Sequence, residues 1–127
     1  MNPLGESTGS GFRERRVGDA YILTVFGGLK GAGELALRNR LDELARYKDL
    51  QVLIDLRELP YMDSTELGRL IRCHISVRQA GGRVRICNIS DRVMHLMRLT
   101  HMDRVFDLYS TEEEALSTMG TGYSTPH

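Results

Sequence analysis

The sequence contains no tryptophan, only three prolines and two cysteines, and no excess of either charge. Seventeen basic residues balance seventeen acidic ones, so the net charge gives no reason to expect binding to nucleic acid or an anionic membrane. No apolar run approaches the roughly 20 residues of a membrane-spanning helix. Residues 1–11 lack the apolar core of a signal peptide. We therefore expect a cytoplasmic protein without nucleic-acid or membrane partners.

The cysteines and histidines do not form a recognisable metal or catalytic site. Cys73 and Cys87 lie in different predicted elements and show no C-x-x-C or Cys/His spacing, so we expect two buried thiols and no metal. His74 falls within the apolar stripe of a predicted helix, which favours a hydrogen-bonded core histidine over a catalytic one. His95 and His101 are six residues apart and do not share a helical face.

The length and composition fit one folded domain with loose ends. A chain of 127 residues with 41% apolar content can bury a core without disulfides or metals. The start of the chain is rich in Gly and Ser, which predicts a disordered arm at 1–11. We expect the domain to span 12–119 and to be followed by a flexible tail at 120–127.

Apolar runs typical of strands alternate with amphipathic stretches typical of helices. Strands are predicted at 12–16, 21–26, 52–56, 83–87 and 105–108. Helices are predicted at 34–47, at 64–80, after a cap at Ser90 or Asp91, and after Ser110, with Glu113 completing a capping box. This alternation predicts an α/β single domain with a mixed β-sheet of four to five strands and about four flanking helices.

The predicted helix at 64–80 has an apolar stripe and a polar face. Arg69 lies on the polar face, with Arg72 and Gln79. The residues expected to be buried are Leu67, Leu70, Ile71, Ile75 and Val77.

The most informative stretch is the junction between the predicted strand at 52–56 and this helix. Asp63 followed by Glu66 forms a capping pattern, in which Ser64 merely tolerates the first helical turn. Alternatively, Ser64 accepts a phosphate, which adds about −1.5 to −2 charges beside free N–H groups at a helix start. Such a dianion would hinder a partner from covering this surface.

A second pattern suggests a nucleotide site. Gly31-Ala32-Gly33-Glu34-Leu35-Ala36 fits G-x-G-x-x-A, and Asp55 follows about 20 residues later, as in dinucleotide-binding domains. A flexible loop ahead of a helix explains the glycines equally well. A small nucleotide-binding module therefore stays open as an alternative.

The same residues resemble the STAS domain of bacterial anti-sigma factor antagonists. The resemblance rests on Tyr61-Met62-Asp63-Ser64-Thr65 with Leu67-Gly68, preceded by the apolar strand at 52–56 and followed by Ala80-Gly81-Gly82. It continues through Cys87-Asn88-Ile89-Ser90 and the stretch from Phe106 to Leu116, and covers nearly the whole chain.

The resemblance implies a STAS-like fold, no catalytic activity and no cofactor. It implies binding to an anti-sigma factor with serine kinase activity, phosphorylation at Ser64, reversal by a serine phosphatase, and a monomer or weak homodimer. The implied partner-binding surface comprises Gly28, Lys30, Asp63, Ser64, Thr65, Glu66 and Arg69.

This chain departs from the family pattern at two places in that surface. Glu66 stands where the family often has glycine, and Gly27-Gly28-Leu29-Lys30 stands where it often has G-E-L-D. The first change adds a negative charge near Ser64, and the second replaces two acids and gains a cation. A non-phosphorylated STAS scaffold is therefore a further alternative.

Overall fold

The computed structural model describes residues 7–9, 11–26, 31–44 and 46–119 of the chain. Its centre is one mixed sheet with the strand order β1-β2-β3-β4-β5-β6. The strands are β1 (Ser7–Gly9), β2 (Phe12–Val17), β3 (Ala20–Val25), β4 (Gln51–Asp55), β5 (Arg83–Cys87) and β6 (Asp107–Tyr109). The first three strands are antiparallel, and β3 to β6 run parallel to one another.

Within the described residues the sheet has six strands, one more than the upper number predicted. The additional strand, β1, pairs with β2 and lies inside the segment 1–11 that was expected to be a disordered arm. That expectation is therefore wrong for Ser7–Gly9, and β2 is not the edge strand of the sheet. The turn between β2 and β3 falls at Gly18-Asp19, where Gly18 has a φ of 58°.

The described residues also form four α-helices and a short 3₁₀ helix. They are α1 (Gly31–Leu44), α2 (Ser64–Gln79), α3 (Asp91–Leu99), η1 (Met102–Arg104) and α4 (Glu112–Ser117). The prediction of an α/β domain with a mixed sheet and four helices is confirmed. Two helix starts differ from those expected: α1 begins at Gly31, and α4 is capped by Thr111, whose side chain accepts from the Glu114 amide. Ser90, rather than Asp91, caps α3.

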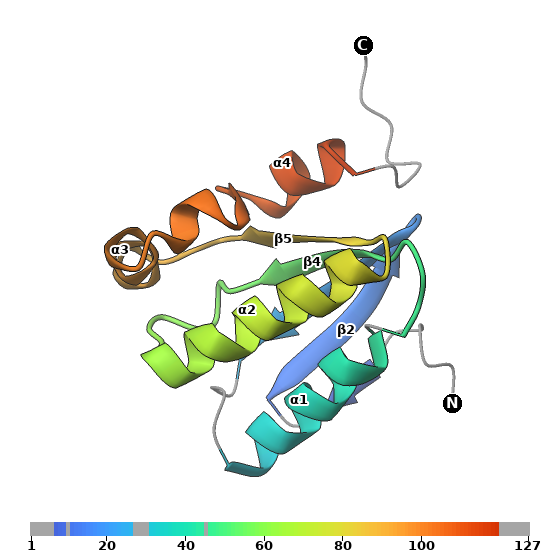
Figure 1. The fold of residues 1–127 in the computed structure, drawn as a ribbon, viewed down its shortest axis with the longest axis horizontal. Coiled ribbons are helices and arrows are strands. Elements are labelled where there is room, and N and C mark those ends of the chain that lie inside the picture. Colours follow the sequence, from blue (N-terminus) through green and yellow to red (C-terminus); the bar gives the residue numbers. More distant parts are fainter. Residues whose placement is uncertain (1–6, 10, 27–30, 45, 120–127) are drawn as a thin grey trace.

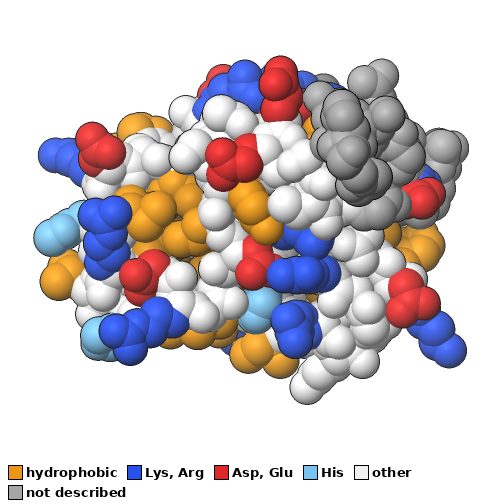
Figure 2. Space-filling view, turned by 90° about the horizontal axis from the view of Figure 1, so that it is seen from above, with side chains coloured by type: hydrophobic (Ala, Val, Ile, Leu, Met, Phe, Trp, Pro, Cys, Tyr) orange, Lys and Arg blue, Asp and Glu red, His pale blue; other side chains and the backbone are white. Residues whose placement is uncertain are grey.

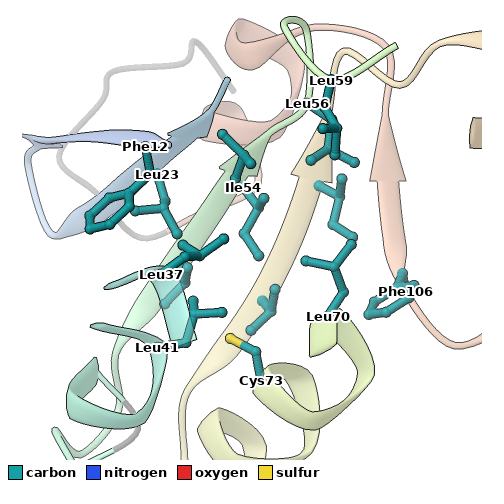
Figure 3. Packing of buried hydrophobic residues seen from close by; sticks show 14 of the residues in the cluster. Phe12, Leu23, Leu37, Leu41, Ile54, Leu56, Leu59, Leu70, Cys73 and Phe106 are labelled. Atoms are coloured by element: carbon teal, nitrogen blue, oxygen red, sulfur yellow. The ribbon is translucent and has the colours of Figure 1, made fainter. Parts of the chain in front are cut away.

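The helices cover the two faces of the sheet unequally. Helices α1 and α2 lie side by side on one face, and α4 packs against β4, β5 and β6 on the other (Figure 1). In the larger core, Leu37 and Leu41 of α1 and Leu70 and Cys73 of α2 face side chains from the strands (Figure 3). The smaller core joins Ala115, Leu116 and Met119 to the opposite face of β3, β4 and β5.

The predicted core of α2 is largely confirmed. Leu67, Leu70 and Val77 are buried, and Ile71 is partly buried against the core. Ile75 was expected in this stripe but is 49% exposed, because the buried face of α2 passes through Cys73, His74 and Val77 instead. Helix α2 ends at Gln79, and Gly81 just beyond the cap adopts a φ of 86°.

The surface over α3 and α4 carries mixed charges. Acidic and basic side chains are interspersed there, and hydrophobic side chains gather toward α3 (Figure 2). A shallow groove on the molecule is lined by Ile89, Met94, Leu108, Tyr109, Ser110 and Glu114. Among the described helices, none is both long and apolar enough to cross a membrane.

Candidate functional site

The segment that joins β4 to α2, residues 56–63, is held against the core by apolar side chains. Leu56, Leu59 and Met62 are all buried, and Leu56 and Leu59 extend the packed row beyond the end of β4 (Figure 3). The Leu56 amide also donates to the Cys87 carbonyl across a distance of 3.1 Å. The loop is therefore a fixed support for the first turn of α2.

A buried carboxylate fixes the beginning of this loop. Asp55 ends β4 with a side chain that is only 1% exposed. Its Oδ1 accepts from the Arg57 amide at 2.9 Å and from Asn88 Nδ2 at 3.1 Å, and its Oδ2 accepts from the Arg57 guanidinium at 2.8 Å. These bonds to Asp55 raise the pKa of Arg57. Sequence reasoning missed this cluster, although an Asp at a strand end with an Arg two residues later suggests such a turn.

A second anchor ties the loop to α3. The Ser90 hydroxyl donates to the Pro60 carbonyl at 2.7 Å and accepts from the Val93 amide at 3.1 Å. One side chain therefore caps α3 and holds the middle of the loop. The sequence indicated the cap but gave no sign of the bond to Pro60, because the two residues are 30 positions apart.

The start of α2 has the capping box that the sequence predicted. An oxygen of Asp63 accepts from the Glu66 amide at 2.9 Å, and Glu66 Oε1 accepts from the Asp63 amide at the same distance. The Leu67 amide donates to the Asp63 carbonyl at 3.0 Å. Two acidic side chains therefore complete the helix end without any contribution from Ser64.

Ser64 is the first residue of α2, and its side chain is exposed. Its hydroxyl has no hydrogen-bond partner among the residues that the structure describes. The adjacent Thr65 is also exposed. In the described part of the chain, the amides of Ser64 and Thr65 likewise find no acceptor. An anion on the Ser64 oxygen would lie close to these two N–H groups and to the positive end of the helix dipole.

The other residues predicted in the partner-binding surface have different surroundings. Asp63 and Thr65 are exposed beside Ser64, whereas Glu66 is only 4% exposed and lies beneath that surface. Arg69 is half-buried and lines a small cavity between α1 and α2. Gly28 and Lys30 lie outside the described residues. Tyr61, which the prediction did not include, is 63% exposed three residues before Ser64.

The structure weakens the alternative of a nucleotide site. Gly31, Ala32 and Gly33 were expected in a loop, but they form the first turn of α1. Asp55, which would have to bind a ribose, is buried, and both of its carboxylate oxygens accept hydrogen bonds from Arg57 or Asn88. The acidic residue of the pattern therefore anchors the loop instead of facing a ligand.

The cysteines and His74 belong to the core. Cys73 and Cys87 are buried free thiols, as predicted, and burial raises the pKa of each to about 12. His74 is buried against Phe106, with ring centroids 5.4 Å apart. The predicted core position is confirmed, but the hydrogen bond expected there is missing at Nδ1, which has no partner among the described residues. Among the described residues, no three His, Cys, Asp or Glu side chains are grouped to hold a metal.

Comparison with known proteins relates this fold and site to one family. The sequence model described as the STAS domain matches residues 13–115. The anti-sigma-B factor antagonist of Bacillus subtilis is 31% identical over 77 residues, which cover 61% of this chain and 70% of the relative. A crystal structure of a putative anti-sigma factor antagonist from Thermotoga maritima superposes with a TM-score of 0.75 at 24% identity, covering 84% of this chain and 92% of the other.

A further solved structure with this fold is of a phosphorylated protein. It is the Bacillus cell fate determinant SpoIIAA in its phosphorylated form, which superposes with a TM-score of 0.66 at 18% identity. The match covers 84% of this chain and 97% of that one. At this identity, the likeness establishes a shared fold.

Proposed function

Because the chain belongs to the STAS domain family, with anti-sigma factor antagonists among its relatives, we propose that it is itself an anti-sigma factor antagonist controlled at Ser64. In this proposal, the unphosphorylated protein binds an anti-sigma factor and so releases the sigma factor. The anti-sigma factor is also a serine kinase that phosphorylates Ser64, and a serine phosphatase reverses the modification. This role would place the protein in the cytoplasm and requires no catalysis by the chain itself.

The observation that carries the proposal is the exposed hydroxyl of Ser64, which makes no hydrogen bond with a described residue and follows the anchored loop at 56–63. A kinase must reach the oxygen, and Ser64 is exposed at the first position of α2. The fold must also survive the modification. Asp63 and Glu66 cap α2 by themselves, so phosphorylation of Ser64 breaks no hydrogen bond that the described residues make.

The expected effect of the phosphate is on the surface and not on the fold. The group adds about −1.5 to −2 charges. Nearby amides and the helix dipole stabilise that charge, while Asp63 repels it, so the two effects oppose one another within the domain. A partner that covers Ser64 would have to desolvate the dianion, which disfavours the complex. The modification therefore acts as a switch for docking.

The direct test is phosphorylation by each anti-sigma factor serine kinase encoded in the genome that carries this gene. The purified chain is incubated with each kinase and ATP, and the modified residue is identified by mass spectrometry. We expect labelling of the wild type and of Thr65→Ala, and none of Ser64→Ala. Thr65→Ala is the matched control, because it removes the adjacent exposed hydroxyl. Labelling at another residue, or none by any kinase, contradicts the proposal and favours the scaffold alternative.

Binding gives a second test of the same proposal. Ser64→Asp places a negative charge at the modified position, and we expect it to weaken capture of the anti-sigma factor at least tenfold, or about 1.4 kcal/mol. Its melting temperature should stay close to that of the wild type, because the exposed side chain makes no contact that holds the fold. A Ser64→Asp protein that binds with undiminished affinity is incompatible with the switch.

A further inference from the structure

A glycine interrupts the exposed face of α2 one turn after Ser64. Gly68 is four residues beyond Ser64, so the two positions are neighbours on the helix surface. Gly68 is exposed, and it lies in the interior of a helix of 16 residues. Glycine at such a position lowers helix stability by about 1 kcal/mol relative to alanine.

The described part of the fold gives no reason for this glycine. Gly68 is not among the residues with positive φ, so its backbone conformation suits any residue. A Cβ built at this position meets no described atom within 4 Å, so no described neighbour excludes a side chain. By contrast, a Cβ at Gly82 would lie 2.3 Å from the Leu50 carbonyl oxygen. Packing within the domain requires Gly82, whereas no contact among the described residues requires the empty space at Gly68.

We propose that Gly68 is a docking notch, at which the anti-sigma factor packs directly against the backbone of α2. This inference rests on the function proposed above. A partner that brings its active site to the Ser64 oxygen must also cover the next position on the same face, and a side chain there would hold it away. Because Gly68 has no Cβ, the partner surface can lie closer to the backbone of α2 than it could at any other residue type.

The next position along this stripe indicates the chemistry of the partner. Arg72 follows Gly68 by four residues and is exposed. It forms no ion pair with any residue that the structure describes. It lies about 12 Å along the helix axis from Ser64. We therefore expect the partner surface to carry a carboxylate opposite Arg72, at this distance from the group that transfers phosphate to Ser64, because charge complementarity steers association.

The test compares Gly68→Ala with Gln79→Ala, a matched control at an exposed position near the other end of α2. Affinity is measured by titration with the anti-sigma factor that phosphorylates the wild type. Gly68→Ala should raise the melting temperature by about 3 °C, since alanine favours helix. It should also weaken binding about tenfold and slow phosphorylation of Ser64. Gln79→Ala should leave affinity unchanged.

The outcomes separate this inference from the function on which it rests. If no anti-sigma factor binds the wild type, the proposed function fails and the docking notch fails with it. If the wild type binds and Gly68→Ala binds equally well, the notch alone is wrong. A Gly68→Ala protein that melts below the wild type would also overturn it, because the glycine would then serve the fold.

A charge substitution tests the second part of the inference. Arg72→Ala should weaken binding several-fold at low salt, and the difference from wild type should shrink as salt is raised. An affinity for Arg72→Ala equal to that of the wild type at low salt would overturn the assignment of an acidic partner surface. The Gly68→Ala effect should change little with salt, because it is steric.

Discussion

Ser64 and Ser90 both stand at the start of a helix, and the structure uses them in opposite ways. The Ser90 hydroxyl caps α3 and also donates to the Pro60 carbonyl. The Ser64 hydroxyl makes no hydrogen bond with any described residue, because Asp63 caps α2 in its place. The same functional group is thus a structural element at one helix and an unused surface group at the other.

The difference shows how a modifiable serine can be separated from a structural one. Phosphorylation of a hydroxyl that donates a hydrogen bond removes the donated proton and therefore that bond, which destabilises the fold. A hydroxyl one position after an aspartate cap still lies at the start of a helix, where an anion is stabilised. It contributes no capping hydrogen bond, because the aspartate makes that bond. Ser90 also supports Ser64, since its bond to Pro60 holds the loop that precedes α2.

The largest expected difference between the two serines is in phosphorylation. Incubation with the cognate kinase should modify Ser90→Ala and the wild type at Ser64, and Ser64→Ala should show no modification. The reason is that only Ser64 is both exposed and free of hydrogen bonds to described residues. Phosphopeptide mass spectrometry measures the site. Phosphate on Ser90 in the folded wild type would contradict the claim that only Ser64 of the two serines can be modified.

The next expected difference is in stability, where the substitution of Ser90 should have the larger effect. Ser90→Ala should lower the free energy of unfolding by about 1–2 kcal/mol, because it removes a helix cap and a bond to the loop. Ser64→Ala should change it by less than about 0.5 kcal/mol, as for other exposed positions without contacts. Urea denaturation of both variants measures this. Equal losses would show that Ser64 has a structural role that the hydrogen bonds do not reveal.

The elements that the sequence predicted well are those with a strong local pattern. The apolar run at 52–56 became β4, and the capping pattern of Asp63 and Glu66 sets the start of α2. Strand β1 was missed because Ser7–Gly9 has the composition of a loop and becomes a strand only by pairing with β2. Ile75 was wrongly predicted to be buried. The apolar stripe of a helix is wide, and tertiary packing decides which residues at its edges are buried.

The candidate site was predictable in part for the same reason. The positions of Asp63, Ser64 and Glu66 at a helix start follow from local spacing, and the structure agrees with it. The burial of Glu66 and the bond from Ser90 to Pro60 depend on how the loop folds over β4 and α3, which no local pattern encodes. The exposure of Gly68 likewise became visible only in three dimensions.

The aspartate cap offers a smaller and sharper test. Asp63→Ala should lower the free energy of unfolding by about 1 kcal/mol, because the Glu66 amide loses its acceptor. If Ser64 could replace Asp63 as a cap, the substitution would have almost no effect in the wild type and a full effect in Ser64→Ala. We expect equal effects in both backgrounds. A double-mutant cycle followed by urea denaturation measures the coupling between the two residues.

The smallest expected effect concerns His74, on the core side of the helix that exposes Ser64. Burial lowers the pKa of His74, Arg78 on the same helix lowers it further, and Asp107, which also pairs with Arg83, opposes them. Phe106 packs against the ring without adding charge. Since the unfolded chain has the ordinary pKa of 6.5, the folded state binds fewer protons below that pH. The contribution of neutral His74 to stability is therefore full above pH 6.5 and is lost as the pH falls through its lower folded pKa.

Urea denaturation at about pH 7.5 and pH 5.5, on either side of the ordinary histidine pKa, measures this loss. The wild type should lose more stability between the two than His74→Leu, in which the exposed His95 and His101 remain as internal controls. Ser64→Asp should lose as much as the wild type, because the surface site and the core histidine lie on different faces of α2. An identical loss in wild type and His74→Leu would show that the buried ring does not titrate in this range. A changed loss in Ser64→Asp would show instead that charge at the docking face reaches the core, and the independence of the two faces of α2 would be wrong.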